Sequence, residues 1–421
     1  MKIQSHTMHR TELLLMTFCG LIAAVNPVFA RTWTLTTPNG GVFWPPAASS
    51  ADGTQLMIVD GVDKLIYTST NSGITWTQAT NAPLQHWLSV ASSADGTKLV
   101  AVADPATSWS INTSTNAGTT WGAVTNAPNI YWYSIASSAD GTKLVALAMT
   151  NLVYTSTDSG NTWTSNSVPI YTNQWLLVAS SADGNKLVIV GDLGPVFTST
   201  NSGTTWTAET NVPGVNWQAV TCSADGSKLL LVGLTNLIYI SSDWGVTWQS
   251  NSVPGIISWQ TVASSADGSK LVAEASINGP IYTSTNSGAT WSTETNTFNI
   301  YYLGLSVPVP GGSIVSSADG SKFVMTSTIV YTGPIRTMFG GDIFITYSPP
   351  SPQLNITSST GNVWLSWIVT STNFVLQQNL DLTTANWVTL TDTPTLNLTN
   401  LQNEVMLSPS NNSGFYRLAT P

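Results

Sequence analysis

Short apolar runs separated by polar turns make up most of the chain, and the pattern recurs. A typical unit reads WLSVAS, the polar turn SADG, KLVAVA, a variable loop and a third run such as LIYTS. An eight-residue polar phrase then reads STNSGITW at 69–76, and close copies stand at 114–121, 156–163, 199–206, 241–248 and 284–291. Runs of this length, rich in Val, Ile and Trp and bounded by Gly, Asn and Asp, indicate β-strands. The pattern therefore predicts short antiparallel strands joined by tight turns.

The ADG turn gives the period of the repeat. Its aspartates are about 43 residues apart, apart from a longer last interval: Asp52, Asp95, Asp140, Asp183, Asp225, Asp267 and Asp319. In six of the seven units a Trp lies eight residues before the Asp. Four short strands in each unit of this length are typical of a β-propeller blade. The inner runs are apolar on both faces, as expected for sheets covered on each side. We predict an all-β fold with a seven-bladed β-propeller.

The seventh unit has an ADG turn but no copy of the eight-residue phrase. RTWTLTT (31–37) is similar to the fourth-strand segment TTWTAET (204–210), and Trp33 lies 43 residues before Trp76. We therefore predict that the N-terminal strand closes the seventh blade beside IFITYS (343–348). In the alternative, IVYT (329–332) is the third strand, IFITYS is the fourth, and Trp33 stays outside.

The eight-residue phrase resembles the Asp-box, or BNR repeat, of the S-x-D-x-G-x-T-W type. The Asn or Asp can cap turn N–H groups, and the Gly permits positive φ. We expect structural roles for Asn71, Asn116, Asp158, Asn201, Asp243 and Asn286, and for Trp76, Trp121, Trp163, Trp206, Trp248 and Trp291. Families that share the motif include sialidases, other glycan hydrolases, sortilin-like receptors and the photosystem II assembly factor family. The resemblance implies that the hairpin lies on the face opposite the ligand site.

Composition limits the compartment and the partners. Lys2, Arg10 and the apolar run at 13–25 are typical of an export signal over residues 1–30, which predicts a secreted, cell-surface or periplasmic protein. Only 8% of residues are charged and the net charge is −9. Nucleic acid is therefore not an expected partner. Beyond residue 30 the chain has one cysteine, Cys222, so it has no disulfide framework. We expect no membrane span after cleavage, and a monomer.

A proline-rich stretch predicts a domain boundary. SPPSP (348–352) separates the propeller, expected at 31–348, from a tail at 353–421, with 349–352 as the linker. Regularly spaced runs such as VWLSWIV, FVLQQNL and FYRLAT predict a small β-sandwich. The tail resembles the fibronectin-III-like C-terminal modules of secreted bacterial proteins. That resemblance implies surface attachment, sorting or a spacer.

The loops between strands four and one, and between strands two and three, share the face where propellers usually bind ligands. Candidate residues in these loops include Tyr131, Asp104 and Asp192. The seventh unit carries two insertions on this face, and long loops on a rigid scaffold often bear function. Its candidates are Tyr301, Tyr302, Tyr331, Arg336 and Asp342. For the insertions, local repair at the ring-closing seam is the competing interpretation. For the repeated first-strand Trp residues it is packing between blades.

Catalysis finds little support in the sequence. Sialidases use three arginines, whereas residues 31–421 contain only Arg31, Arg336 and Arg417, and the same scarcity argues against the arginine-rich surface of the photosystem family. A glycosidase needs two carboxylates, which could come from Asp60, Asp63, Asp104, Asp192, Glu274 or Asp342. Beyond residue 30, His86 is the single histidine, so we expect no metal and no cofactor. We predict a non-catalytic protein that binds a glycan or a protein. The alternatives are a glycoside hydrolase and an assembly factor.

Overall fold

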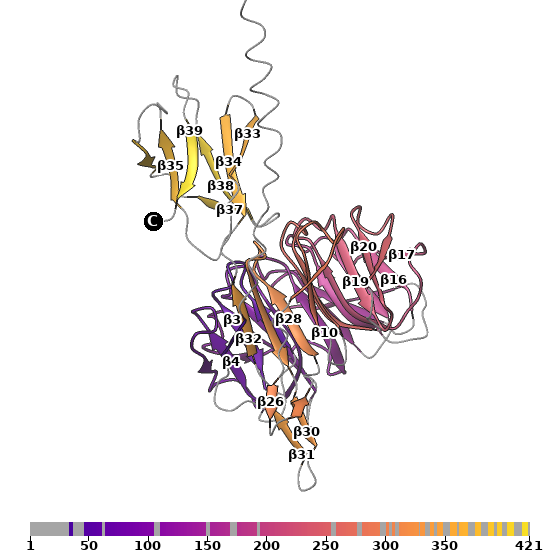
Figure 1. Cartoon of the computed structure of the whole chain (residues 1–421). Coiled ribbons are helices and arrows are strands. Elements are labelled where there is room, and N and C mark those ends of the chain that lie inside the picture. The colour runs from indigo at the N-terminus through magenta and orange to yellow at the C-terminus, as the bar shows by residue number, and fades with distance from the viewer. Residues whose placement is uncertain are drawn as a thin grey trace, which may run out of the picture. The chain divides into compact units, whose positions relative to one another are not determined.

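The computed structural model of the chain is all-β (Figure 1). It describes residues 33–36, 46–60, 64–104, 110–148, 152–168, 175–191, 194–253, 258–275, 280–294, 300–302, 305–307, 311–327, 329–332, 337–340, 343–347, 354–359, 362–368, 375–379, 386–390, 394–397, 402–407 and 415–419. The expected signal segment, residues 1–30, lies outside the described residues. Within the described residues, no helix is long and apolar enough to cross a membrane.

Six four-stranded antiparallel sheets follow one another, and in each the spatial order of the strands is the chain order. The first three are β2 (Ala47–Ser49), β3 (Leu56–Val59), β4 (Ile66–Ser69), β5 (Thr77–Gln78); β6 (His86–Ser92), β7 (Leu99–Asp104), β8 (Ser110–Ser114), β9 (Gly122–Ala123); and β10 (Trp132–Ser137), β11 (Leu144–Ala148), β12 (Leu152–Ser156), β13 (Thr164–Ser167). The next three are β14 (Trp175–Ser180), β15 (Leu187–Gly191), β16 (Val196–Ser199), β17 (Thr207–Glu209); β18 (Trp217–Cys222), β19 (Leu229–Gly233), β20 (Leu237–Ser241), β21 (Gln249–Ser252); and β22 (Trp259–Ser264), β23 (Leu271–Ala275), β24 (Ile281–Ser284), β25 (Ser292–Thr293).

The seventh sheet joins the two ends of the propeller segment. Its order is β28 (Gly311–Ser316), β29 (Lys322–Ser327), β32 (Ile343–Tyr347) and β1 (Trp33–Leu35), and Trp33 pairs with Thr346. Closure by the N-terminal strand is confirmed. The alternative assignment is wrong, because IVYT forms β30 (Ile329–Thr332), which pairs with β31 (Thr337–Gly340) in a separate hairpin, and IFITYS pairs with both β29 and β1. A second extra hairpin, β26 (Ile300–Tyr302) and β27 (Leu305–Val307), precedes β28.

A ring of backbone hydrogen bonds closes the seven blades on themselves. In each blade the Ala of the SADG turn donates its N–H to the carbonyl of the corresponding Ala in the next blade, and the N···O distances are 2.6–2.7 Å. The ring runs through Ala51, Ala94, Ala139, Ala182, Ala224, Ala266 and Ala318, and Ala318 donates back to Ala51. The first strands of adjacent blades also contact one another in order around the same ring. These strands therefore lie nearest the centre of the propeller.

The hydrophobic core lies between the blades. One cluster joins Met57 and Val59 of the first blade to Leu99 and Ala101 of the second, and all four are buried. Corresponding clusters occupy the later interfaces, including the ring-closing one, where Ile58 packs with Ile345. Both faces of each second strand are buried, so alternation of apolar and polar residues disappears there. Propeller stability therefore depends on contacts between neighbouring blades.

The eight-residue phrase forms the turn between the third and fourth strands. In the first copy, Asn71 Oδ1 accepts the N–H of Thr75 at 2.9 Å and its Nδ2 donates to the Thr75 hydroxyl at 2.8 Å. Ser69 Oγ accepts the N–H of Gly73 at 2.8 Å. The residue before the Gly also has positive φ in all six copies, although none is Gly: Ser72, Ala117, Ser159, Ser202, Trp244 and Ser287. The fixed network of hydrogen bonds offsets this backbone strain.

The tail consists of two small sheets. One contains β33 (Asn355–Ser359), β34 (Asn362–Ile368), β38 (Gln402–Leu407) and β37 (Thr395–Asn397), and the other contains β36 (Val388–Thr389), β35 (Val375–Asn379) and β39 (Phe415–Ala419). Leu365, Trp367 and Val405 of the first sheet share a buried cluster with Leu376 of the second. The two sheets therefore pack face to face, as in a β-sandwich.

Candidate functional site

The two faces of the propeller differ in what they contain. In each of the first six blades the eight-residue turn bonds to the SADG turn of the same blade, as in the hydrogen bond from Ser159 N–H to the Thr142 carbonyl at 2.8 Å. Both kinds of turn therefore lie on one face, which we call the turn face. The loops that enter first strands and third strands open on the opposite face, which we call the loop face.

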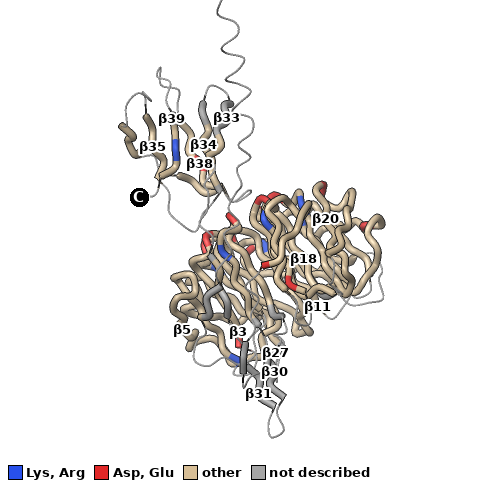
Figure 2. The backbone as a smooth tube through the Cα atoms, viewed as in Figure 1, with Lys and Arg blue, Asp and Glu red and all other residues tan. Residues whose placement is uncertain are grey.

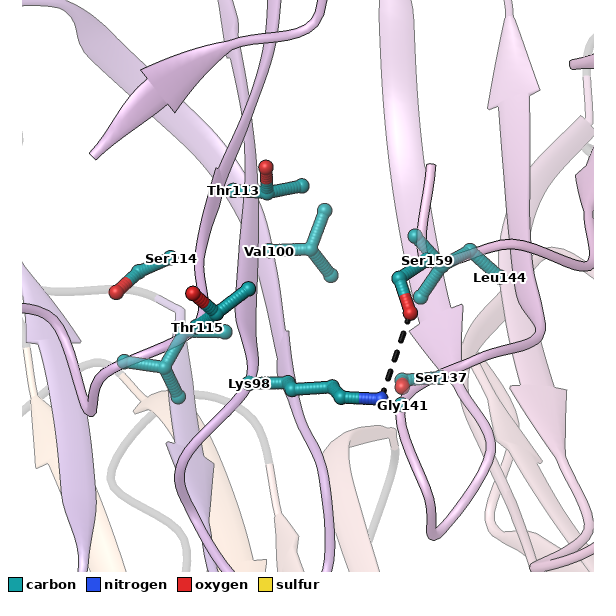
Figure 3. A pocket seen from close by; sticks show the side chains of 10 residues that line it. Lys98, Val100, Thr113, Ser114, Thr115, Ser137, Gly141, Leu144 and Ser159 are labelled. Carbon is teal, nitrogen blue, oxygen red and sulfur yellow. Dashed lines mark hydrogen bonds between the residues drawn. The ribbon is translucent and has the colours of Figure 1, made fainter. Parts of the chain in front are cut away.

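Lysines fasten adjacent blades along the turn face. Lys98 Nζ donates to Ser159 Oγ at 3.5 Å (Figure 3) and to the carbonyl of Asp140 at 2.8 Å. One amine therefore joins both turns of the next blade. Lys186, Lys228, Lys270 and Lys322 donate in the same way to the Asp carbonyl of the next SADG turn. Lys143 donates instead to Asn185 Oδ1, just after the SADG turn of the next blade. Many of the basic residues of the propeller accordingly lie beside acidic ones in Figure 2. This face carries a repeated structural device.

The first blade departs from this device. Gln55 stands where the other blades have Lys, and no side-chain hydrogen bond from Gln55 to the second blade is found among the described residues. The hydroxyl acceptor of such a lysine is also absent from the second blade. Its hairpin has Ala117 at the position where Ser72, Ser159 and Ser287 accept a lysine bond in other blades. Among the described residues, the interface between blades one and two therefore lacks the lysine hydrogen bond that joins the other adjacent blades on the turn face.

The described pockets also belong to the turn face. One lies between the second and third blades and is lined by Lys98, Val100, Thr113, Gly141 and Ser159 (Figure 3). Two others are lined by the corresponding residues of later blades, including Lys143 and Lys228. Because the same small space recurs beside each lysine stem, it is a feature of blade packing and no candidate ligand site.

On the loop face, the first-strand Trp side chains pack between blades. Trp87, Trp132, Trp217 and Trp259 are at most 2% exposed. Trp217 Nε1 donates to the carbonyl of Gly194 in the preceding blade at 3.0 Å, and Trp132 packs with Val100 and Val102 of the second blade. These aromatic rings are enclosed in the blade interfaces and are not available to a ligand.

A β-bulge follows this Trp in each blade from the second to the sixth. The register of the ladder shifts between Trp132 and Ser134, and corresponding shifts occur after Trp87, Trp175, Trp217 and Trp259. A bulge leaves one residue unpaired and changes the direction of its side chain, and bulges are frequent at the edges of functional sites. Here the unpaired residues are Leu88, Tyr133, Leu176, Gln218 and Gln260.

The residues that flank the Trp form a group that we call the rim. Its described side chains are half-buried and belong to four blades: His86 and Leu88, Tyr131 and Tyr133, Asn216 and Gln218, Ser258 and Gln260. They lie where the innermost strands begin on the loop face. The surrounding sequence repeats almost unchanged, whereas the pair of residues that flanks the Trp is a different combination in each of these four blades, although Gln follows the Trp in two of them. The backbone conformation at the rim therefore repeats from blade to blade, while the combination of side chains changes.

Two rim pairs have defined internal contacts. The Tyr131 and Tyr133 rings lie 4.7 Å apart between centroids at an interplanar angle of 46°, and burial raises the pKa of the Tyr133 phenol. Gln218 Nε2 donates to Asn216 Oδ1 at 3.0 Å. His86 Nδ1 is buried without a hydrogen-bond partner among the described residues. The rim thus contains aromatic rings and amide groups with defined positions on a rigid scaffold.

Glu274 is the most unusual carboxyl group on the described part of the chain. It is 4% exposed, and its Oε2 has no hydrogen-bond partner among the described residues. Burial raises the pKa of Glu274 to about 8. Its neighbour Val272 packs against Phe323 and Met325 of the seventh blade, and alternation along the strand turns Glu274 toward the same interface. An uncharged acid in a closed interface fits blade packing better than attack on a substrate.

The structure locates the sequence-predicted site residues unevenly. Tyr131 is described in full, whereas Asp104, Tyr301, Tyr302 and Tyr331 are described only as backbone, in β7, β26 and β30. Arg336, Asp342 and Asp192 lie outside the described residues. Within the described residues, no group of three or more His, Cys, Asp and Glu could hold a metal ion. A ligand-binding role for the sequence-predicted site residues therefore stays a prediction.

Sequence reasoning missed most of the rim. Asn216, Gln218, Ser258 and Gln260 were not among the candidates, because their loops carry no insertion and no charge. The signal was present in the repeat itself. Aligning the units on the first-strand Trp leaves the two flanking positions as variable residues inside a constant frame. That contrast could have singled them out.

Comparisons with known proteins identify the fold of the chain but no family to which it belongs. No family model matches the chain, and no curated protein matches it. Among solved structures, YCF48 bound to a D1 peptide aligns with a TM-score of 0.57 at 15% identity, over 75% of this chain and 97% of that one. YCF48 from Cyanidioschyzon merolae aligns with a TM-score of 0.55 at 12% identity, over 75% and 98%. At this identity the similarity shows a β-propeller fold.

Proposed function

We propose that the chain is a non-catalytic binding protein that holds an extended segment of another protein at the rim. One observation carries the proposal: at five structurally equivalent bulges the two residues that flank the Trp form a different pair in each blade, while the frame around them repeats. Repetition serves packing, whereas variation at fixed positions suits recognition of one particular ligand. The neighbour solved with a bound peptide supports a protein ligand over a glycan. Within this proposal, the six hairpins support an Asp-box type of propeller.

Peptide display against residues 31–421 tests this function directly. We expect selective enrichment of related peptide sequences, and its loss in a Tyr131→Ala/Tyr133→Ala/Gln218→Ala variant. A matched control, Ile74→Ala/Thr164→Ala/Gln249→Ala, changes three exposed residues on a hairpin and two outer strands and should bind as the unmodified chain does. A glycan array in parallel separates the ligand classes. Selective glycan binding without peptide binding, or an equal loss in both variants, would contradict the proposal.

We also propose that the protein acts outside the cytoplasm, after removal of residues 1–30. The basic residues and the apolar run of that segment support this placement. N-terminal sequencing of the protein isolated from the cell-envelope and culture-medium fractions tests this placement. A start near residue 31 is expected, and an intact Met1 on purely cytoplasmic protein would refute the placement.

A further inference from the structure

The second blade has a polar residue at a position of the third strand that is aromatic in every other blade. Asn112 occupies this position and pairs with Ala101 of the second strand. The corresponding residues of the other six blades are Tyr67, Tyr154, Phe197, Tyr239, Tyr282 and Phe344. The neighbours of Asn112 show whether this replacement is isolated.

Two neighbouring positions change together with Asn112. In the third blade three apolar residues pack in the cluster at the interface with the preceding blade: Ile130, Leu152 and Tyr154. The fifth blade has the same apolar set: Val215, Leu237 and Tyr239. The second blade has polar residues at the three equivalent positions: Gln85, Ser110 and Asn112. Three apolar side chains are therefore replaced by three polar ones at one place, the interface between blades one and two.

The three polar side chains bond to one another. Ser110 Oγ donates to Gln85 Oε1 at 2.7 Å. Asn112 Nδ2 donates to Gln85 Oε1 at 3.2 Å and to Ser110 Oγ at 3.0 Å. These bonds use both hydrogens of the Asn112 amide and the hydroxyl hydrogen of Ser110. The amide of Asn112 keeps only its acceptor oxygen for a further bond.

That oxygen is buried. Asn112 is 1% exposed, and its Oδ1 has no hydrogen-bond partner among the described residues. Leaving a buried acceptor without a donor costs free energy, and most such groups are bonded to protein or to ordered water. Gln85 and Ser110 are half-buried, so the polar network extends from accessible side chains inward to this oxygen.

The tryptophans beside the polar cluster keep the arrangement of the third blade. Trp87 and Trp121 lie 6.3 Å apart between centroids at 40°, and Trp132 and Trp163 lie 6.2 Å apart at 41°. In the third blade Tyr154 also meets Trp132 edge-on at 5.1 Å. The second-blade rings have therefore not moved to replace a tyrosyl ring. Ser and Asn are smaller than Leu and Tyr by more than the ~30 Å³ that one water takes up in the liquid.

We propose that Gln85, Ser110 and Asn112 form a binding site for one water molecule, which donates a hydrogen bond to Asn112 Oδ1 in the interface between blades one and two. Water suits this site because it is small, uncharged and a donor. Gln85 Nε2 takes no part in the three bonds of the cluster and can donate to the same water. A hydrated contact then joins these blades where the third blade has a packed aromatic ring.

A crystal structure of residues 31–421, at a resolution that shows ordered water and from crystals grown without polyols, tests the site. We expect a water within hydrogen-bond distance of Asn112 Oδ1. A donor supplied by the chain itself, or an oxygen with no ordered neighbour, would overturn the proposal.

Variants assign the bond to Asn112. Asn112→Leu keeps a side chain of similar size without the acceptor, and its crystal structure should lack the water. Gln85→Ile/Ser110→Leu/Asn112→Tyr restores the apolar set of the third blade and should also lack the water, with the new ring edge-on to Trp87. Gln78→Leu, on the exposed outer strand of the first blade, is the control and should keep it. Water retained in Asn112→Leu would contradict the assignment. If the variants do not fold, the structure of the unmodified chain decides alone.

Discussion

One side chain closes each eight-residue hairpin, and it accounts for the repetition of that phrase. Asn201 Oδ1 accepts the Thr205 N–H at 2.9 Å and its amide donates to the Thr205 hydroxyl at 2.8 Å. In two other copies a carboxylate takes this place, and Asp158 accepts both the N–H and the hydroxyl of Thr162. The requirement at this position is for an acceptor at fixed geometry, and either residue type meets it.

Removing this acceptor should destabilise the propeller by a modest amount. Asn201→Ala leaves the Thr205 N–H without its partner, and we expect a loss of about 1 kcal/mol in the free energy of unfolding. Asn201→Asp should retain most of the stability, because Asp158 and Asp243 already occupy equivalent places. Urea unfolding of the two variants measures this. An equal loss in both would show that the cap contributes through something other than its acceptor.

A buried carboxyl makes stability depend on pH in a defined direction. The pKa of Glu274 is raised from 4.5 to about 8 in the folded protein because burial disfavours the charged form. The folded state therefore keeps a proton that the unfolded state releases, and this stabilising effect is complete below pH 4.5 and is lost as the pH rises through about 8. Glu274→Gln should abolish that dependence. We expect the variant to exceed the unmodified chain in stability at pH 9, and parallel pH profiles would refute the assignment.

At the scale of strands and blades, much of the structure was predictable from the sequence. The ADG period and the apolar runs give the four strands of the first six blades, and the likeness of 31–37 to 204–210 identifies β1 as the closing strand. The lysine bonds were not predictable, since the ADG phrase shows a Lys but not that its amine crosses to the next blade. The bulges were also missed, because an extra unpaired residue leaves the apolar pattern unchanged.

The interface between blades one and two offers a test of the lysine bonds. A Gln55→Lys/Ala117→Ser variant introduces the pair of groups that Lys98 and Ser159 supply one interface later. We expect about 1 kcal/mol of added stability and slower amide hydrogen exchange in β2 and β6. Gln55→Lys alone should give a smaller gain. Unchanged amide hydrogen exchange in both variants would mean that the lysine hydrogen bonds do not stabilise the interface between blades.

At the scale of the whole molecule, one face holds the ring together and the other is left free to vary. The turn face carries the Ala ring, the lysines and the hairpins, all repeated around the propeller. The loop face carries the rim, where each blade contributes a different pair of side chains. Propeller architecture brings these separate positions to one place near the centre, although they lie about 43 residues apart in the chain. Side chains at the rim can therefore differ without disturbing the fold.

Hydrogen exchange of residues 31–421, with and without a peptide selected by display, tests the binding role most directly. The account predicts protection at the starts of β6, β10, β18 and β22 and in the loops that precede them, with the hairpins unaffected. Protection confined to the hairpins or to the outer strands would contradict a binding site at the rim.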